Sequence, residues 1–334
     1  MKLQILVPHY KETAEVIKPL LDSIALQQNI DFSEVGVIIC HDGEDILDFD
    51  FPDSMEQLDC ADFPVYPFKI EQIHIKHKGV SAARNACLDH AVADYVMFCD
   101  ADDIFYNVCA FWILFREFES GFDSLISMFI EETRTPDRKR VEYVNHAQDS
   151  TFVHGKVHRR QYLIDNKIRF NPKLTIHEDS YFNILAQGLS KNLKYCQTPF
   201  YLWRWRDESV CRHDPKYILK TYKNMIDSND ALVDNFLGRG MRDKAMFYTA
   251  FMIFDAYYCM NKPEWINQKN KSYRNKTEKR FAKYFEKHRD LWDSVSDADK
   301  MQISVQVRNR SVMEGMQMES VTIDDWLTSV EKIK

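Results

Sequence analysis

The sequence predicts an α/β protein in which helices flank a mostly parallel central sheet, followed by a helical C-terminal region. Two observations predict this class. Apolar runs at residues 3–7 and 35–40 are separated by a segment with helical periodicity, and strand–helix–strand order produces a parallel sheet. From Pro215 onward the apolar residues follow helical spacing. We therefore expect an α/β domain over residues 1–214 and a helical region over residues 215–334.

The composition is that of a soluble globular protein, with 45% hydrophobic and 28% charged residues in 334. The net charge of −7 argues against general nucleic-acid binding, which needs a basic surface. The eight cysteines are scattered without a Cys-x-x-Cys pair, and this favours a reducing compartment. The N-terminal residues enter a strand directly and lack the small-residue cleavage site of a signal peptide, so we expect a cytoplasmic protein.

The first strand, at residues 3–7, is stopped by Pro8, and Thr13 is expected to cap the helix that follows. Pro19 is expected to kink this helix or to mark its first turn. The second strand ends in His41-Asp42-Gly43, which puts the Asp42 carboxylate at the carboxyl end of a strand. The apolar stripe of the helix consists of Val16, Ile17, Leu20, Leu21 and Ile24.

Residues 44–67 are acidic, contain three prolines and show no period, so we expect an irregular insertion. Residues 70–75 alternate apolar with polar side chains, which predicts a half-buried strand. Ser81 is then expected to cap a helix. A helix N-terminus attracts anions, and Arg84 adds a positive charge near the same end.

The apolar run after Asp94 ends in three carboxylates, Asp100, Asp102 and Asp103. In open α/β sheets ligands bind just beyond the carboxyl ends of the strands. Mg²⁺ and Mn²⁺ prefer carboxylate oxygen, and Mg²⁺ commonly takes one or two carboxylates together with substrate phosphates. We therefore hypothesise a metal–diphosphate site. The alternative is that Asp103 caps a helix beginning near Asn107 and the other two acids are solvated turn residues.

Four further elements follow the acidic cluster. A helix with a broad aromatic face is expected to end near Gly121, and residues 125–130 are expected to form a strand. Residues 131–140 are expected to be a charged loop, and residues 141–144 to return as a strand.

Glu178 and Asp179 open a helix whose apolar residues, from Tyr181 onward, have the spacing of a buried face. Acids in a first turn complement the helix dipole, which is one interpretation. The other is that one of them acts as a general base, a carboxylate in a cleft that takes a proton from a hydroxyl. The local pattern leaves both interpretations open.

The order of these motifs resembles the family 2 glycosyltransferases with the GT-A fold, over residues 1–213. The motifs that carry the resemblance are Pro8-His9-Tyr10, Asp42, the segment from Gly79 to Asn85, Asp100-Ala101-Asp102, Gly155-Lys156 and Glu178-Asp179. Two features depart from the family pattern: His9 stands where a small apolar residue is usual, and the insertion at residues 44–67 follows the second strand.

The resemblance implies metal-dependent, inverting transfer of a sugar from a nucleotide-sugar donor, expected to be a UDP-sugar, to a hydroxyl of a glycan, polymer or lipid-linked acceptor. Mn²⁺ or Mg²⁺ would be the cofactor. Asp179 would be the catalytic base, with Glu178 supporting it. The implied metal ligands are Asp102, Asp100 and His213. The implied donor-binding residues are Pro8, Tyr10, Asp42, Gly79, Arg84, Asp100, Ala101, Lys156, Arg206 and Arg212.

Two other functions compete with the transfer of a sugar. A nucleotidyltransferase of similar fold would carry a Gly-rich, basic signature after the first strand, which residues 8–12 lack. A non-catalytic sugar-binding or scaffold protein would have no need of Asp179 alongside Asp102.

In the C-terminal region, helices are expected at residues 217–236, 243–260, 271–289 and 297–307. In the third of these, Tyr273, Phe281, Tyr284 and Phe285 are interleaved with Lys and Arg. This pattern is typical either of a helix at an acidic membrane surface or polymer, or of a helix with one packed aromatic side and one solvated charged side. Acceptor choice, self-association and a peripheral membrane contact are the roles left open for the region.

Overall fold

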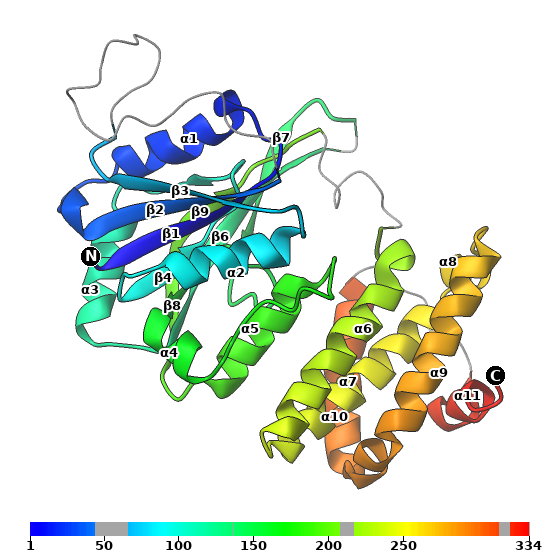
Figure 1. Ribbon diagram of the computed structural model, residues 1–334. Helices are drawn as coiled ribbons and strands as arrows, with labels where there is room; N and C mark the ends of the chain where they lie inside the picture. The colour runs from blue at the N-terminus through cyan, green and yellow to red at the C-terminus, as the bar shows by residue number, and fades with distance from the viewer. Residues whose placement is uncertain (44–65, 136, 208–216, 314–320, 334) are drawn as a thin grey trace. The chain divides into compact units, whose positions relative to one another are not determined.

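The chain is described by a computed structural model, which falls into two compact units, Met1–Ser209 and Val210–Lys334 (Figure 1). Each unit has its own hydrophobic core. The insertion expected at residues 44–67 lies almost wholly outside the described residues, and so do Arg212 and His213. The described residues are 1–43, 66–135, 137–207, 217–313 and 321–333.

Within its described residues the first unit contains one mixed sheet of nine strands, in the order β3-β2-β1-β4-β8-β6-β9-β5, with β7 paired to β6. The four strands from β3 to β4 are parallel to one another, and β8 runs antiparallel to β4. The strands are β1 (Leu3–His9), β2 (Val35–Asp42), β3 (Lys69–Ile75), β4 (Tyr95–Phe98), β5 (Ile104–Phe105), β6 (Ser124–Arg134), β7 (Val141–His146), β8 (Lys156–Arg159) and β9 (Leu193–Trp203).

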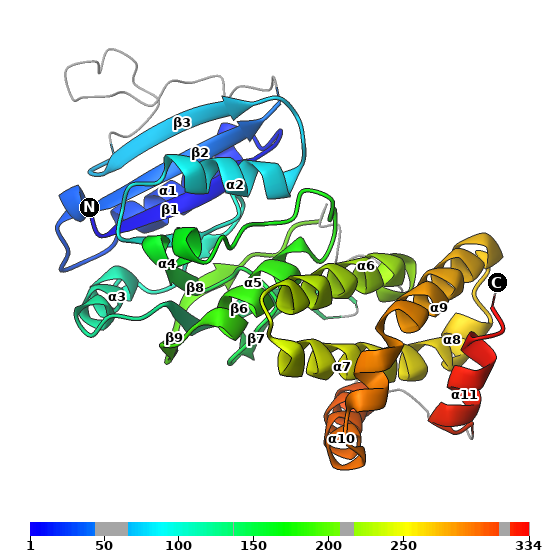
Figure 2. The same cartoon turned by 60° about the horizontal axis from the view of Figure 1, so that its bottom comes forward.

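Helices cover both faces of this sheet, because alternate side chains of a strand point to opposite faces (Figure 2). Leu3, Ile5 and Val7 of β1 pack in a core that includes α1 and α3, while α2 packs against β1 and β2 on the other face. Full burial of each such side chain contributes roughly 1.5–3 kcal/mol. The helices of this unit are α1 (Ala14–Ala25), a 3₁₀ turn (Phe32–Glu34), α2 (Val80–His90), α3 (Ala110–Glu119), α4 (Arg160–Asp165) and α5 (Glu178–Leu189).

The predicted α/β class, with a parallel strand–helix–strand unit and a helical C-terminal region, is confirmed, and three local expectations are wrong. Of the two alternatives for Pro19, the first turn is wrong, because α1 starts at Ala14 and includes Pro19 in its second turn, while the kink stays a prediction. Glu131–Arg134, expected in a charged loop, belongs to β6, because these residues pair with β7. Ser81 does not cap α2: Gly79 is the N-cap residue, and the Ser81 hydroxyl donates a hydrogen bond to the Leu174 carbonyl.

The strand order reverses at β1, which has β2 and then β3 on one side and β4 on the other. The carboxyl ends of these parallel strands lie at the same edge of the sheet. A crevice opens at such a reversal because the flanking connections leave in opposite directions. The residues at the carboxyl ends of β1, β2 and β4 therefore meet there.

The second unit is helical throughout its described elements. α7 contacts α6, α9 and α10, and more than half of its residues are buried. No helix in the described parts of the chain combines the length and the apolar run that a bilayer crossing requires. Its helices are α6 (Tyr217–Gly238), α7 (Arg242–Met260), α8 (Pro263–Ile266), α9 (Lys271–Ser294), α10 (Asp297–Met313) and α11 (Ile323–Val330).

The aromatic side of α9 belongs to the core of this second unit. Phe281, Tyr284 and Phe285 are buried, and Tyr273 packs against the same core. Of the two interpretations of this helix, the packed aromatic side is therefore the one that the structure supports.

Candidate active site

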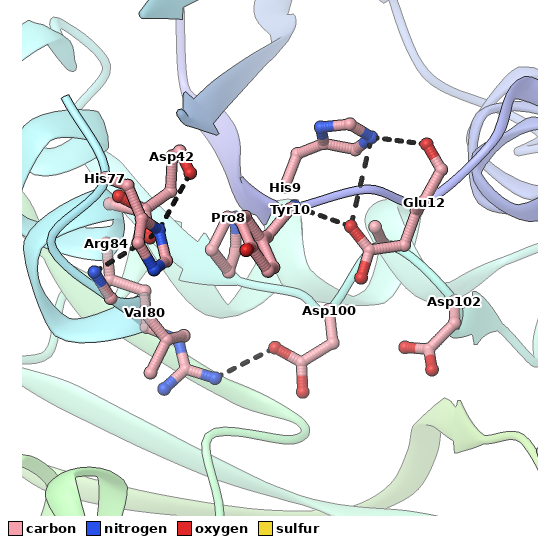
Figure 3. Close-up of a pocket in the computed structure, with 13 residues that line it drawn as sticks. Pro8, His9, Tyr10, Glu12, Asp42, His77, Val80, Arg84, Asp100 and Asp102 are labelled. Carbon is pink, nitrogen blue, oxygen red and sulfur yellow. Dashed lines mark hydrogen bonds and ion pairs between the residues drawn. The ribbon is translucent and has the colours of Figure 1, made fainter. Parts of the chain in front are cut away.

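The carboxyl ends of β1, β2 and β4, together with the start of α2, surround a pocket of about 320 Å³ (Figure 3). This volume lies within the range of small-molecule sites. Seven of the ten residues predicted to bind the donor line the pocket, as does Asp102. Among the described residues the lining consists of Pro8, His9, Tyr10, Glu12, Asp42, His77, Gly79, Val80, Ala83, Arg84, Asp100, Ala101 and Asp102.

Arg84 links the pocket to α5. Its guanidinium is buried, and it donates from Nη2 to Asp100 and from Nη1 to Glu178, both at 2.9 Å. Burial alone would lower the pKa of Arg84, but the charges of Asp100 and Glu178 raise it. Arg84 therefore stays a fixed cation that joins two carboxylates from distant parts of the chain.

The packing of α5 explains how Glu178 reaches Arg84. Phe182 stands one turn after Glu178 and packs edge-to-face against Phe98, at 5.4 Å between ring centroids. Residues four apart lie on one face of a helix, so Glu178 points toward the same end of β4. The acidic cluster begins just beyond it, at Asp100.

Asp179 lies beside Glu178 at the start of α5 and is partly exposed. Burial is the main cause that raises its pKa, to about 7, and the charge of Glu178 adds to the shift, while Arg84 opposes it. One carboxyl oxygen of Asp179 accepts a hydrogen bond from the Ser180 amide at 2.7 Å. A carboxyl group with this pKa can exchange a proton near neutral pH.

Asp100 and Asp102 have different neighbours, which shift their pKa values in opposite directions. Burial would raise the pKa of Asp100, but the Arg84 guanidinium lowers it below the usual value. Burial, followed by the charge of Asp100, raises the pKa of Asp102, and Arg206 Nη1 lies 3.0 Å from its Oδ2. Of these two carboxylates, Asp102 is therefore the one whose negative charge is less compensated by neighbouring groups.

Asp103 does not cap a helix. α3 begins at Ala110, after the N-cap residue Cys109. The buried Asp103 carboxylate instead accepts hydrogen bonds from the Tyr201 hydroxyl and, at 2.8 Å, from the Arg204 amide. It holds the end of β9 against the acidic cluster.

Asp42 fixes the loop before α2. Its carboxylate accepts hydrogen bonds from the Lys78 and Gly79 amides at 2.7 and 2.8 Å. His77 Nδ1 lies 2.9 Å from the same carboxylate. Gly79 has φ +89°, a conformation that favours glycine, and no atom lies within 4 Å of a Cβ placed there. The N-terminus of α2 is thus held open toward the pocket.

Glu12 is a pocket residue that sequence reasoning missed. Its carboxylate accepts a hydrogen bond from the Tyr10 amide at 2.6 Å, and His9 Nε2 lies 2.7 Å from its carbonyl oxygen. Burial raises the pKa of Glu12, and the charge of Asp102 adds to this effect. An acid two positions after Pro-His-Tyr was a usable signal, because it follows a strand that ends at the pocket.

His9, His77, Val80 and Ala83 are the other lining residues that were not predicted as site residues, although His9 was noted as a departure from the family pattern. Val80 and Ala83 belong to the first turn of α2, and a helical pattern cannot show which of its residues face a ligand. His77 lies in the loop between β3 and α2, where no periodicity applies.

Of the predicted donor-binding residues that the structure describes, Lys156 and Arg206 are not part of this pocket lining. Lys156 is buried, with its ammonium 3.3 Å from Asp149, and the charge of Asp179 acts on it. Arg206 contacts Asp102 from outside the lining. Arg212, like the predicted metal ligand His213, lies outside the described residues.

Glu12, Asp100 and Asp102 place three carboxylates around one pocket. Hard oxygen donors of this kind fit Mg²⁺ or Mn²⁺, and a divalent cation would relieve the repulsion that raises the pKa of Asp102. Asp100, Asp103 and His154 also offer ligand atoms within 4.8 Å of one another. Because Asp103 is buried and hydrogen-bonded, the residues that fit a cation best are those at Asp102.

Residues 4–129 match the family model described as Glycosyl transferase family 2. The match supports the family that the motif order indicated. It covers the strands and the acids around the pocket, from β1 to Asp103, and ends before Glu178.

Two proteins of Bacillus subtilis (strain 168) that are named as glycosyltransferases are similar to this chain. The match to EpsH has 20% identity over 277 residues, which is 77% of this chain and 76% of EpsH. The match to EpsJ has 24% identity over 227 residues, which is 62% of each chain. These matches indicate a glycosyltransferase.

The fold is that of the Staphylococcus aureus protein TarS. The structure of TarS residues 1–349 superposes with a TM-score of 0.61 at 15% identity and covers 97% of this chain and 95% of that one. Against a longer TarS structure the TM-score is 0.59, and this chain spans 54% of that protein. The GT-A-like α/β fold with a helical C-terminal region, as predicted, is shared with TarS.

Proposed function

We propose that the protein transfers a sugar from a UDP-sugar to a hydroxyl group of a glycan, polymer or lipid-linked acceptor. The observation that carries this proposal is the double ion pair of Arg84, which connects Asp100 in the pocket with Glu178 beside the candidate base. TarS, which shares the fold, has structures in complex with UDP and with UDP-GlcNAc, and this supports the choice of donor.

In the proposed donor complex the nucleobase lies against Tyr10 and Pro8, and Asp42 accepts a hydrogen bond from it. Asp100 faces the ribose, and the Arg84 ion pair keeps this carboxylate ionised and oriented. The open N-terminus of α2 at Gly79 and the positive charge of Arg84 favour the approach of an anionic diphosphate.

A Mg²⁺ or Mn²⁺ ion is proposed to be held by Asp102 and Asp100, with His213 as the further ligand implied by the family resemblance. When bound, such a cation offsets the negative charge of the departing diphosphate. Arg206, now 3.0 Å from Asp102, is a second cation at the same place and is available to contact the diphosphate.

Asp179 is proposed as the general base, and Glu178 as the residue that positions Arg84. Asp179 takes the proton of the acceptor hydroxyl while the acceptor oxygen bonds to the anomeric carbon. The bond from this carbon to the diphosphate breaks on the opposite face, which inverts the configuration. A base whose pKa is near 7 suits this task, and such catalysis contributes roughly 10²- to 10⁴-fold in rate.

The second unit is proposed to take part in acceptor choice or self-association. We keep a cytoplasmic location, with or without a peripheral membrane contact, as part of the proposal, on the ground of the scattered cysteines.

The test separates binding from transfer. We expect Asp179→Asn to bind UDP with Mn²⁺ as the wild type does, because the base is not a donor contact, and to lose roughly 10²-fold or more in turnover. We expect Asp102→Ala to weaken metal-dependent UDP binding. Calorimetry measures the binding, and UDP release from a panel of UDP-sugars, with water as the acceptor, measures turnover.

Asp165→Asn is the matched control, because Asp165 is an exposed acid on α4 whose carboxylate accepts a hydrogen bond from Gln161. This variant should change neither UDP binding nor turnover. Unchanged turnover in Asp179→Asn would remove the base from the mechanism, and the absence of UDP binding by the wild type would overturn the proposed donor.

A further inference from the structure

Tyr10 and His77 stack on each other at the mouth of the pocket (Figure 3). Their ring centroids are 4.6 Å apart and the ring planes differ by 19°. The two residues come from different loops, one after β1 and one before α2. Tyr10 is 44% exposed, and the His77 side chain 56%, so solvent reaches both rings.

His77 is also bonded to Asp42. Its Nδ1 lies 2.9 Å from Asp42 Oδ2 and 3.1 Å from the Asp42 carbonyl oxygen. A backbone carbonyl oxygen can only accept a hydrogen bond, so the proton is placed on Nδ1. The imidazole thus presents a flat ring to Tyr10 and an N–H group to Asp42.

These are the two interactions that the proposed function gives to the nucleobase. A uracil ring would stack on Tyr10 and donate its N3–H to Asp42. A centroid distance of 4.6 Å is already near the lower end of the contact range for two aromatic rings, so no third ring fits between Tyr10 and His77. A base that stacks on this face of Tyr10 therefore has to take the place of His77.

The rest of the loop is held independently of His77. The Lys78 and Gly79 amides bond to the two oxygens of Asp42, so they keep the loop in place when the imidazole leaves. A carboxylate has about four acceptor positions, and the departure of His77 frees one of them on Oδ2. Asp42 can then accept a hydrogen bond from the base while it keeps its hydrogen bonds to the Lys78 and Gly79 amides.

We propose that His77 occupies the nucleobase subsite of the donor-free protein as a stand-in for the pyrimidine, and that donor binding exchanges the His77–Asp42 contact for a base–Asp42 contact. This inference rests on the proposed function. His77 is then a competitor for the subsite, and it lowers the affinity for every donor that carries the base.

The experiment measures uridine and UDP binding to the full chain by calorimetry. Uridine has no diphosphate for a metal ion to contact, so its affinity measures binding at the nucleobase subsite alone. We expect His77→Ala to bind uridine and UDP roughly three- to tenfold more tightly, the gain expected if the subsite is open about a third to a tenth of the time. His77→Phe keeps a ring for Tyr10 but has no N–H for Asp42, and should fall between His77→Ala and the wild type.

Lys76→Ala is the control, since Lys76 is an exposed residue of the same loop. It should leave both affinities unchanged, and equal melting temperatures would show that all variants are folded. Equal or weaker binding by His77→Ala, with normal binding by the wild type, would overturn this inference and leave the proposed function standing. If the wild type binds neither uridine nor UDP, the proposed donor and this inference both fail.

Discussion

Asp100, Asp102 and Asp103 are chemically identical and lie within four positions of the chain, yet each has a different partner. Asp100 is paired with Arg84, Asp102 faces Arg206, and Asp103 is buried against Tyr201. The pKa of Asp100 is lowered, whereas the pKa values of Asp102 and Asp103 are raised, first by burial. At the scale of residues, surroundings and not residue type decide what each acid can do.

The raised pKa of Asp179 predicts how turnover depends on pH. Because burial raises the pKa of Asp179 to about 7, this carboxyl keeps its proton at lower pH and is a base only when ionised. Turnover should therefore rise with pH through about 7. The measurement is kcat/KM for a UDP-sugar between pH 5.5 and 8.5. A profile that is flat across this range, as expected for an aspartate with the usual pKa near 4, would contradict the assignment.

At the scale of elements, Gly155 sets how closely β8 approaches β6. Its φ is +68°, and a Cβ placed there would lie 2.6 Å from Ser127 Oγ. The Ser127 amide and hydroxyl both donate to the Gly155 carbonyl, at 2.9 and 2.8 Å. The Gly-Lys motif thus has a structural reason in this chain, since glycine is needed for both the conformation and the contact.

Two alanine substitutions separate these effects. Gly121 has a similar φ of +65°, but no atom lies within 4 Å of its Cβ position. Gly121→Ala should cost only the left-handed conformation, about 1 kcal/mol, while Gly155→Ala adds the clash with Ser127 and should cost about 2–4 kcal/mol. Urea unfolding measures both free energies. Equal losses of unfolding free energy in the two variants would show that the close approach at Gly155 does not contribute to stability.

At the scale of the whole molecule, two units with separate cores predict that damage to one leaves the function of the other intact. In the second unit Asp230 accepts from Arg280, Lys287 and His288 at 2.6–2.8 Å. Burial would raise the pKa of Asp230, but these three partners lower it. The stabilisation it provides is therefore present above pH 4, near the pKa of an unfolded aspartate, and is lost as the pH falls further.

We expect Asp230→Ala to destabilise the second unit by about 1.5–3 kcal/mol at pH 7, the usual loss for hydrogen bonds to a charged group. UDP binding at the first unit should be unchanged at temperatures below the transition. Thermal unfolding followed in parallel with calorimetric UDP binding tests both parts. Loss of UDP binding by a variant that is still folded would show that the two units depend on each other.

The sequence alone was sufficient for the α/β class, for most strands and helices, and for most of the residues that line the pocket around Asp100. Each of these depends on local information: apolar periodicity marks the elements, and the carboxyl ends of parallel strands meet at one edge. Four of the six described helices of the second unit, α6, α7, α9 and α10, were predicted for the same reason, but the partner of the aromatic side of α9 was not.

Only the tertiary structure decided which side chains meet. Arg84 and Glu178 are 94 positions apart, and Asp42 and His77 are 35 apart, so no local period relates them. The order of strands in the sheet and the packing of Phe182 on Phe98 bring these groups within hydrogen-bonding distance. Burial then sets their charges, because the cost of removing a charge from water depends on every neighbouring group, and those neighbours come from the whole fold.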